Sequence, residues 1–218
     1  MIWGVGTGRC GTAGLAVQLG GEHERHGSVA ELAAGGHRAV VDPGFWRVIP
    51  SIYDVDPTAR FVVIYRDPVE VVESLLSVGI FRCEFDELNK VPYAWNVRPP
   101  VWPGTWEPYQ KAAWLWRTIN SRIMEMVLTN FEVRHVSELD THLNKGVEGK
   151  LTFGVLQEKV RLTQDQRLWV LNYCGPTMDM LYYLKDATHG ATGAWGKPIE
   201  VEHEVIVKDW REEGWDDS

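Results

Sequence analysis

The chain has 218 residues, of which 44% are apolar, and a formal net charge of −8; these values suit one domain over residues 1–218 with a sizeable core and argue against a disordered chain. The acidic balance argues against nucleic acid as a partner, and the lack of a long apolar run or a secretory leader argues against a membrane span or export. The three cysteines, Cys10, Cys83 and Cys174, lack the spacing of a disulfide framework or a zinc site, so we expect a cytoplasmic protein.

The first nineteen residues predict a strand, a glycine-rich loop and a helix. Residues 1–5 form a short apolar run typical of a buried strand, and apolar residues return at helical spacing from Thr12 onward. Between them, three glycines surround one cation, Arg9. Glycines let backbone N–H groups converge, and the N-terminus of the following helix is positive. The segment therefore predicts a cradle for a phosphate or sulfate ester.

Strands and helices continue to alternate up to residue 76. After a polar loop over 20–27, the pattern predicts, in order, a helix from the N-cap Ser28 to Ala34, a strand over 38–42, a helix from Pro43 that ends before Pro57, and a buried strand over 60–65. Asp67 is a suitable N-cap with Pro68 at the first helical position, so a helix should follow through Leu76.

The second half of the chain begins with a proline-rich stretch, 79–108, in which we expect an irregular lid or insertion. Beyond it the pattern predicts the longest helix at about 109–128, a fourth strand over 131–136, two helices over 164–173 and 178–184 separated by a break at Gly175-Pro176, and an acidic, frayed tail over 209–218.

This alternation predicts a three-layer α/β fold, with a mostly parallel central sheet flanked by helices and the P-loop-like glycine loop after the first strand. In such sheets, ligands bind beyond the carboxyl ends of the strands. The first strand leads into Gly6 and the third into Arg66. Both loops are therefore expected to open at the same edge.

Two nucleotide-binding patterns overlap with the glycine loop, and neither fits it fully. Residues 6–11 satisfy G-x-G-x-x-G, but dinucleotide-binding domains also carry an acid about twenty positions on, and Asp42 on the second strand lies well beyond that spacing. As a Walker-type loop, 6–11 is followed by Thr12-Ala13 instead of Lys-Ser/Thr, so the hydroxyl that binds magnesium is missing. A reaction that transfers an anionic group without a metal would not need this hydroxyl.

Two segments resemble the donor-binding motifs of sulfotransferases. Gly6-Thr7-Gly8-Arg9-Cys10-Gly11-Thr12 resembles their 5′-phosphosulfate loop, G-x-x-[RK]-S-G-T, with Cys10 in place of serine. Residues 65–74 resemble their 3′-phosphate motif, in which R-[DN]-P is followed by a serine eight positions after the arginine; here these residues are Arg66 and Ser74. The two motifs lie within about residues 1–76, and beyond that the similarity is mostly in pattern.

A third, looser similarity lies near the C-terminus. Residues 190–197, GATGAWGK, resemble the G-x-x-G-x-W-K loop of cytosolic sulfotransferases through Gly193 and Trp195, with Lys197 one place late. The resemblance implies that these two residues also help to bind the donor.

The resemblance implies an enzyme that transfers a sulfuryl group from 3′-phosphoadenosine 5′-phosphosulfate (PAPS) to a hydroxyl or amine, without a metal, and releases 3′-phosphoadenosine 5′-phosphate (PAP). The acceptor would be a small molecule or a saccharide. Residues 6–12 with Arg9 would hold the phosphosulfate, and Arg66 with Ser74 the 3′-phosphate. The residue types agree, because a donor with anionic groups at both ends of an adenosine needs two separated anion holders.

The acceptor also needs a general base within hydrogen-bonding reach. In sulfotransferases this base is usually a histidine or glutamate, and in several branches it is a glutamate after the first helix. His23 and Glu24 occupy that segment here. We place Glu24 first and His23 second as catalytic residues, followed by Asp42 and His26, although each can instead be a solvated loop residue.

The other site residues also have structural alternatives. Arg9 can be a surface cation in a turn, Arg66 can pair with an acid such as Asp67, and Ser74 can be an ordinary helix-surface hydroxyl. We expect Cys10 to be a small packing residue and not a nucleophile. At the level of function, the alternatives are a P-loop nucleotide kinase-like enzyme, a Rossmann-type reductase and a non-catalytic nucleotide-binding module.

Overall fold

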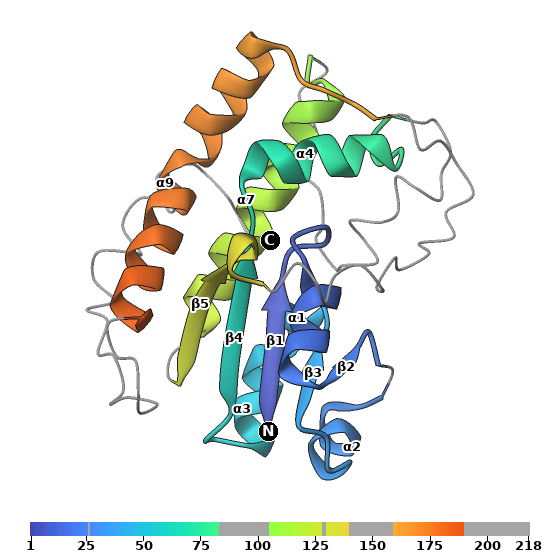
Figure 1. Ribbon diagram of the computed structural model, residues 1–218, viewed down its shortest axis with the longest axis vertical. Coiled ribbons are helices and arrows are strands. Elements are labelled where there is room, and N and C mark those ends of the chain that lie inside the picture. The colour runs from blue at the N-terminus through green and yellow to red at the C-terminus, as the bar shows by residue number, and fades with distance from the viewer. Residues whose placement is uncertain (26, 83–104, 128–129, 140–158, 190–218) are drawn as a thin grey trace, which may run out of the picture.

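A parallel sheet of five strands forms the centre of the computed structural model (Figure 1). The structure describes residues 1–25, 27–82, 105–127, 130–139 and 159–189. The strand order is β2-β3-β1-β4-β5, and every neighbouring pair is parallel. The strands are β1 (Ile2–Gly6), β2 (Glu22–His23), β3 (Ala39–Val41), β4 (Arg60–Tyr65) and β5 (Phe131–His135). This is the α/β layered fold that the alternating pattern predicts.

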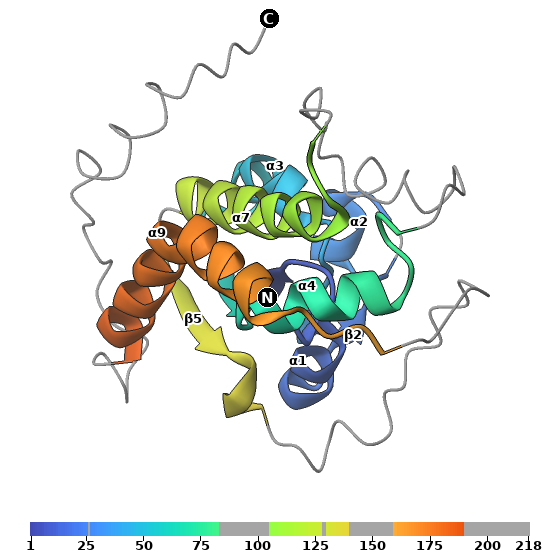
Figure 2. The same ribbon diagram turned by 90° about the horizontal axis from the view of Figure 1, so that it is seen from above.

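Helices cover both faces of the sheet. The helical segments within the described ranges are α1 (Thr12–Leu19), α2 (Val29–Ala34), η1 (Phe45–Val48), α3 (Ile49–Val55), α4 (Pro68–Ser77), α7 (Pro108–Met126), η2 (Val136–Glu138) and α9 (Gln164–His189). Figure 2 shows α1 on the opposite side of the sheet from α7. None of the helices in these ranges combines the length and apolar character needed to cross a membrane.

Alternation along β4 explains the two layers. Phe61, Val63 and Tyr65 belong to the large apolar cluster shared with α4, α7 and α9, whereas Val62 and Ile64 belong to a smaller cluster shared with α1. Because successive side chains of a strand point to opposite faces, the apolar residues 61–65 of this one strand supply both layers of the core. The continuous β-branched run in this strand therefore has the burial expected of a central parallel strand.

Local capping sets the helix starts largely as predicted. Ser28 and Glu31 form a capping box at α2, and the Asp67 carboxylate accepts the Val69 N–H at 2.8 Å at the start of α4. The helix expected from Pro43 begins instead as the 3₁₀ segment η1 and becomes α-helical at Ile49.

The predicted loop over 20–27 contains a short edge strand that the sequence analysis missed. In β2, Glu22 pairs with Val40 and His23 pairs with Val41 of β3. A two-residue strand is too short to show an alternating pattern, so its position depends on the neighbouring strand.

The predicted break at Gly175-Pro176 is wrong, because α9 runs without interruption through Pro176. At 26 residues α9 is also longer than α7, which has 19. A proline inside a helix costs about 3 kcal/mol, but one apolar stripe of α9 is buried on both sides of it. That stripe consists of Val170, Cys174, Met178, Leu181 and Leu184.

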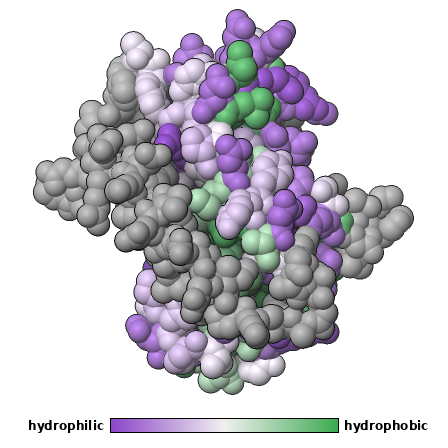
Figure 3. Space-filling view, turned by 90° about the vertical axis from the view of Figure 1, so that its left-hand side faces the viewer, coloured by the Kyte–Doolittle hydropathy of each residue, from purple (hydrophilic) through white to green (hydrophobic). Residues whose placement is uncertain are grey.

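The exposed side of α9 carries several large apolar side chains. Figure 3 shows apolar surface within a mostly hydrophilic face on this side of the molecule. The large apolar residues exposed on α9 are Leu168, Leu171, Tyr182 and Tyr183.

Most of the predicted lid (83–104) and the whole acidic tail (209–218) lie outside the described residues.

Candidate functional site

The carboxyl ends of the strands bring the candidate residues to one edge of the sheet. Because all strands are parallel, His23 at the end of β2, Gly6 at the end of β1 and His135 at the end of β5 share this edge. Asp42 directly follows β3, and Arg66 directly follows β4. The glycine loop lies in the middle, since β1 is the central strand.

The loop between β1 and α1 leaves the start of the helix open. Gly11 is the N-cap residue of α1, has φ +102°, and as a glycine supplies no side-chain cap to this end of the helix. Arg9 also has a positive φ, +69°. Backbone N–H groups at the start of a helix need partners from outside the helix. The first turn of α1 can therefore offer its N–H groups to an anion.

Close packing explains the glycine at the end of β1. A Cβ atom at Gly6 would collide with the carbonyl oxygen of Ile64 and would lie 2.7 Å from the Cys10 sulfur. At Gly11, a Cβ atom would lie 2.8 Å from Val136 Cγ2, so η2 packs against the far side of the loop. The loop is therefore enclosed by β4 and η2, and its shape requires both glycines.

The Arg9 guanidinium connects the two predicted motifs. Its Nε donates a hydrogen bond to Ser74 Oγ of α4 at 3.0 Å. Burial and the nearby positive charge of Arg66 lower the pKa of Arg9 below its usual value. Two cations from adjacent strand ends therefore share a partly buried space, and an anion bound between them would relieve their repulsion.

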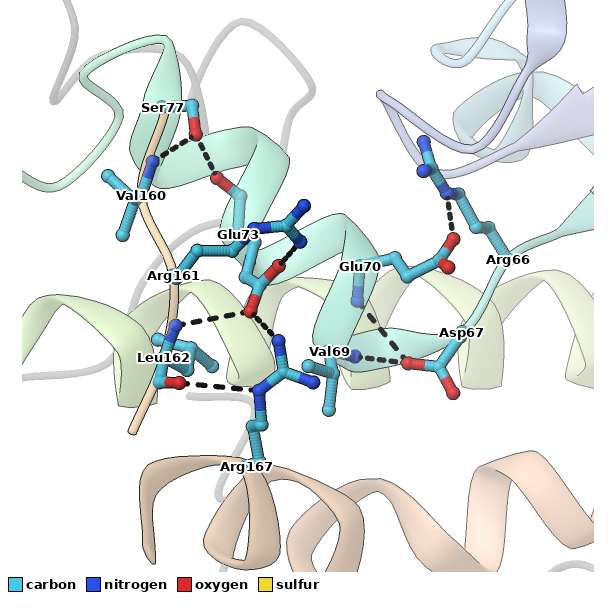
Figure 4. A network of polar contacts seen from close by, with 10 residues as sticks. All are labelled: Arg66, Asp67, Val69, Glu70, Glu73, Ser77, Val160, Arg161, Leu162 and Arg167. Atoms are coloured by element: carbon cyan, nitrogen blue, oxygen red, sulfur yellow. Dashed lines mark hydrogen bonds and ion pairs between the residues drawn. The ribbon is translucent and has the colours of Figure 1, made fainter. Parts of the chain in front are cut away.

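Arg66 has a carboxylate partner in the first turn of the helix that follows it, α4. Its Nε lies 2.6 Å from Glu70 Oε2, and this pair is substantially exposed (Figure 4). The structural alternative, an ion pair between Arg66 and a nearby acid, is therefore present, but the acid is Glu70, because the Asp67 carboxylate caps α4. The Arg66 carbonyl accepts a hydrogen bond from Trp116 Nε1 at 3.2 Å. The backbone at the end of β4 is thus held by α7, while the guanidinium uses only its Nε for Glu70.

Behind Ser74, a buried carboxylate ties α4 to the start of α9. Glu73 is 5% exposed and accepts hydrogen bonds from Arg161 Nη1 and Arg167 Nη2, both at 2.5 Å, and from the Leu162 N–H at 3.1 Å (Figure 4). Burial disfavours the charge on Glu73, but these bonds outweigh it and hold the pKa of Glu73 below its usual value. This network was not anticipated, since its partners lie 88 to 94 residues away in the chain.

The two leading base candidates lie beside the loop. His23 Nε2 is 3.0 Å from the Thr12 hydroxyl at the first residue of α1 and 3.8 Å from Glu24 Oε1. Glu24 is exposed and has φ +51°. Asp42 Oδ1 instead accepts the Gly44 N–H at 2.5 Å and so stabilises the turn after β3.

Cys10 belongs to the core under the loop. It is fully buried against the Thr7 hydroxyl, and burial raises the pKa of its thiol to about 12. A thiol with so high a pKa stays protonated near neutral pH and is a poor nucleophile. Cys10 therefore acts as a packing residue.

His135 is a site-edge residue that sequence reasoning missed. It pairs with Tyr65 across β4 and β5, and the two rings lie 5.0 Å apart. Its Nδ1 accepts the Ser137 N–H at 3.3 Å, and burial with the nearby charge of Lys185 lowers the pKa of His135. Its position as the last residue of a parallel strand was the available indication.

Some predicted site residues lie outside the described ranges, namely His26, Gly193, Trp195 and Lys197. Within those ranges, no group of three or more histidine, cysteine, aspartate or glutamate side chains could hold a metal ion.

Comparison with known proteins finds no matching family model, curated protein or solved structure.

Proposed function

We propose that the chain is a sulfotransferase that uses PAPS as its donor. The observation that carries the proposal is the Arg9–Ser74 hydrogen bond beside Arg66. It joins the loop that resembles a 5′-phosphosulfate site to the helix that resembles a 3′-phosphate site. A donor with anionic groups at both ends of one nucleoside requires such a pair of adjacent anion holders.

Each part of the edge has a role in this proposal. The open N-terminus of α1 and the Thr12 hydroxyl bind the 5′-phosphosulfate. Arg66 binds the 3′-phosphate through its Nη groups, since Glu70 occupies Nε, and Ser74 adds a hydroxyl. Arg9 lies between the two groups and meets charge at the bridging oxygen.

The transfer step balances without a further reactant. The acceptor oxygen or nitrogen attacks sulfur in line with the bond to the 5′-phosphate, and that S–O bond breaks to release PAP. The acceptor proton passes to the general base, for which Glu24 is the first choice and His23 the second. Arg9 stabilises negative charge on the leaving oxygen, which grows only as the bond breaks.

A thermal-shift panel with PAP, AMP, ATP with Mg²⁺, NAD⁺ and NADP⁺ tests the donor assignment. A ligand at a hundred times its dissociation constant adds about 2.7 kcal/mol of apparent stability. We expect PAP to stabilise the protein far more than AMP. Selective stabilisation by Mg²⁺-ATP would favour a kinase-like enzyme, and stabilisation by NAD⁺ or NADP⁺ a reductase. Binding of PAP without sulfuryl transfer from PAPS to any of a panel of alcohols, amines and saccharides would leave a binding module.

Paired substitutions test the base. Glu24→Gln should keep PAP affinity while turnover falls roughly 10²–10⁴-fold, which is the usual scale of general base catalysis. His23→Gln should lower turnover less. The opposite ranking would transfer the role to His23, and near-wild-type turnover in both variants would exclude both residues.

A further inference from the structure

The direction of hydrogen bonding at the Thr12 hydroxyl depends on its neighbour His23. Thr12 is 5% exposed, is the first residue of α1, and has His23 Nε2 at 3.0 Å from its Oγ1. A hydroxyl has one proton to donate and two lone pairs that accept. If Thr12 donates to a bound anion, its oxygen is free only to accept from His23.

The charged groups described near His23 have other partners or lie farther from its Nε2 than the Thr12 hydroxyl does. His23 lies on β2 and packs against β3 and α1, neither of which contains a charged residue. The nearest carboxylate, Glu24, is 3.8 Å from the same nitrogen. Among the other charged groups of this region, Glu22 is paired with Arg25 and with His37, and Asp42 accepts the Gly44 N–H. Among the residues that the structure describes, the Thr12 hydroxyl is therefore the hydrogen-bonding partner of Nε2.

We propose that His23 is a positioning residue for the anion site: its Nε2–H donates to Thr12 Oγ1, so that the Thr12 proton points at an oxygen of the bound sulfate or phosphate ester. In the empty site the hydrogen bond can run in either direction, because a neutral imidazole nitrogen either donates or accepts. An anion selects one direction, since an anion accepts hydrogen bonds and does not donate them. The 5′ identity of that anion rests on the proposed function.

This assignment separates two roles at the end of β2. A nitrogen that carries a proton and donates it to Thr12 is not available to take a proton from an acceptor. The neighbouring carboxylate of Glu24 is exposed and remains free for that task. His23 would then act on donor affinity, and Glu24 on the chemical step.

A double-mutant cycle measures whether His23 acts through Thr12. We would compare PAP affinity by calorimetry in the wild type, Thr12→Val, His23→Leu and the double variant. Each single change should weaken PAP binding several-fold to tenfold, the scale of one hydrogen bond. The double variant should bind within about twofold of Thr12→Val, because the second change removes a partner already lost. His23→Gln retains a hydrogen-bond donor and Thr12→Ser retains a hydroxyl. Each should therefore recover most of the affinity that is lost in His23→Leu or Thr12→Val.

Losses that multiply in the double variant would overturn the proposal and leave the sulfotransferase assignment standing. A measurement on the wild-type protein covers variants that fail to fold: ¹⁵N NMR of the His23 ring should show Nε2 protonated in the PAP complex, and an unprotonated Nε2 there would overturn the proposal. If PAP does not bind but inorganic sulfate does, with the same coupling, the proposed function fails and the role of His23 stands. If neither anion binds, both are overturned.

Discussion

The sheet edge contains two strand–loop–helix units that look alike in sequence and differ in how their helices begin. The first, β1 to α1, reaches its helix through Gly11, which has no side chain with which to cap α1. The second, β4 to α4, reaches its helix through Asp67, whose carboxylate accepts two N–H groups of the first turn. The helix N-terminus of the first unit is thus open to an external anion, whereas the second is already satisfied.

The second unit contributes side chains instead of backbone. Arg66 precedes the capped turn, Ser74 extends from α4 to Arg9, and Glu73 anchors the same helix to α9. A capped and anchored helix holds these side chains in place, while the uncapped helix leaves its first N–H groups for an external anion. One sheet edge thus combines backbone N–H groups from the first unit with side chains from the second, and substitutions in the two units should have different effects.

The largest effect should come from removing the partners of Glu73. Arg161→Met combined with Arg167→Met leaves a buried carboxylate without counter-charge, so the free energy of unfolding should fall by about 3–5 kcal/mol. Denaturant titration measures the loss. Arg122→Met is the control, since the exposed Arg122 pairs at 3.5 Å with the half-buried Glu125, and its loss should cost less than about 1 kcal/mol. Equal losses in the two proteins would show that the network does not anchor α4.

The Glu73 carboxylate also gives this stability a pH signature. Its pKa is lowered in the folded state, so its contribution is present above the unfolded-state pKa and is lost as the pH falls through the folded-state value. Stability should therefore decrease on acidification. In Glu73→Gln this part of the decrease should be absent, and an unchanged acid profile would contradict the assignment.

Replacing Arg9 breaks the link between the two units. Arg9→Ala should reduce turnover roughly 10²–10³-fold, about 2.7–4 kcal/mol, because its cation meets charge that develops in the transition state. PAP affinity should fall less, and Arg9→Lys should recover part of the activity. Steady-state kinetics at saturating PAPS, together with PAP calorimetry, measure the two effects. Unchanged turnover would show that Arg9 has a structural role only.

Replacing Arg66 isolates the second unit. Arg66→Ala should weaken PAP binding at least tenfold and AMP binding little, because charge-assisted hydrogen bonds contribute about 1.5–3 kcal/mol and only PAP carries a 3′-phosphate. Glu70→Gln is the control: it keeps Arg66 and removes an exposed pair, so affinity should change by no more than about fivefold. A similar loss for both nucleotides would remove the 3′-phosphate assignment.

Removing the cap tests whether the N-terminus of α4 serves stability alone. Asp67→Ala should cost about 1 kcal/mol of unfolding free energy, while Asp67→Asn should retain most of it, since asparagine also caps helices. PAP affinity should hardly change in either variant. A large loss of affinity with normal stability would mean that this helix start also contacts the ligand.

The smallest change in stability should come from giving α1 an internal anion. Ala13 is the second residue of α1, where a carboxylate interacts favourably with the helix dipole. Ala13→Glu should stabilise the fold by about 0.3–1 kcal/mol and weaken PAP binding, because the new charge competes with the ligand. Ala13→Gln is the neutral control. Unchanged PAP binding in Ala13→Glu would argue against an anion at this helix start.

Local patterns in the sequence determined much of the fold. The apolar run at 60–65, the Asp67-Pro68 helix start and the Ser28 capping box are present in the structure as predicted. Each depends on residues within a few positions of one another, so the local sequence is enough to predict it. The glycine loop and its cation were recognisable for the same reason.

Tertiary packing decided what local patterns could not. The pairing of Glu22–His23 with β3, the continuity of α9 through Pro176 and the Glu73 network depend on segments distant in sequence. The hydrogen bond between Arg9 and Ser74 likewise depends on tertiary structure, because it requires β1 to lie beside β4 in the sheet. Such contacts form only when the whole core is buried, because the free energy of burial is shared among elements and can outweigh a local preference such as that of proline against a helix.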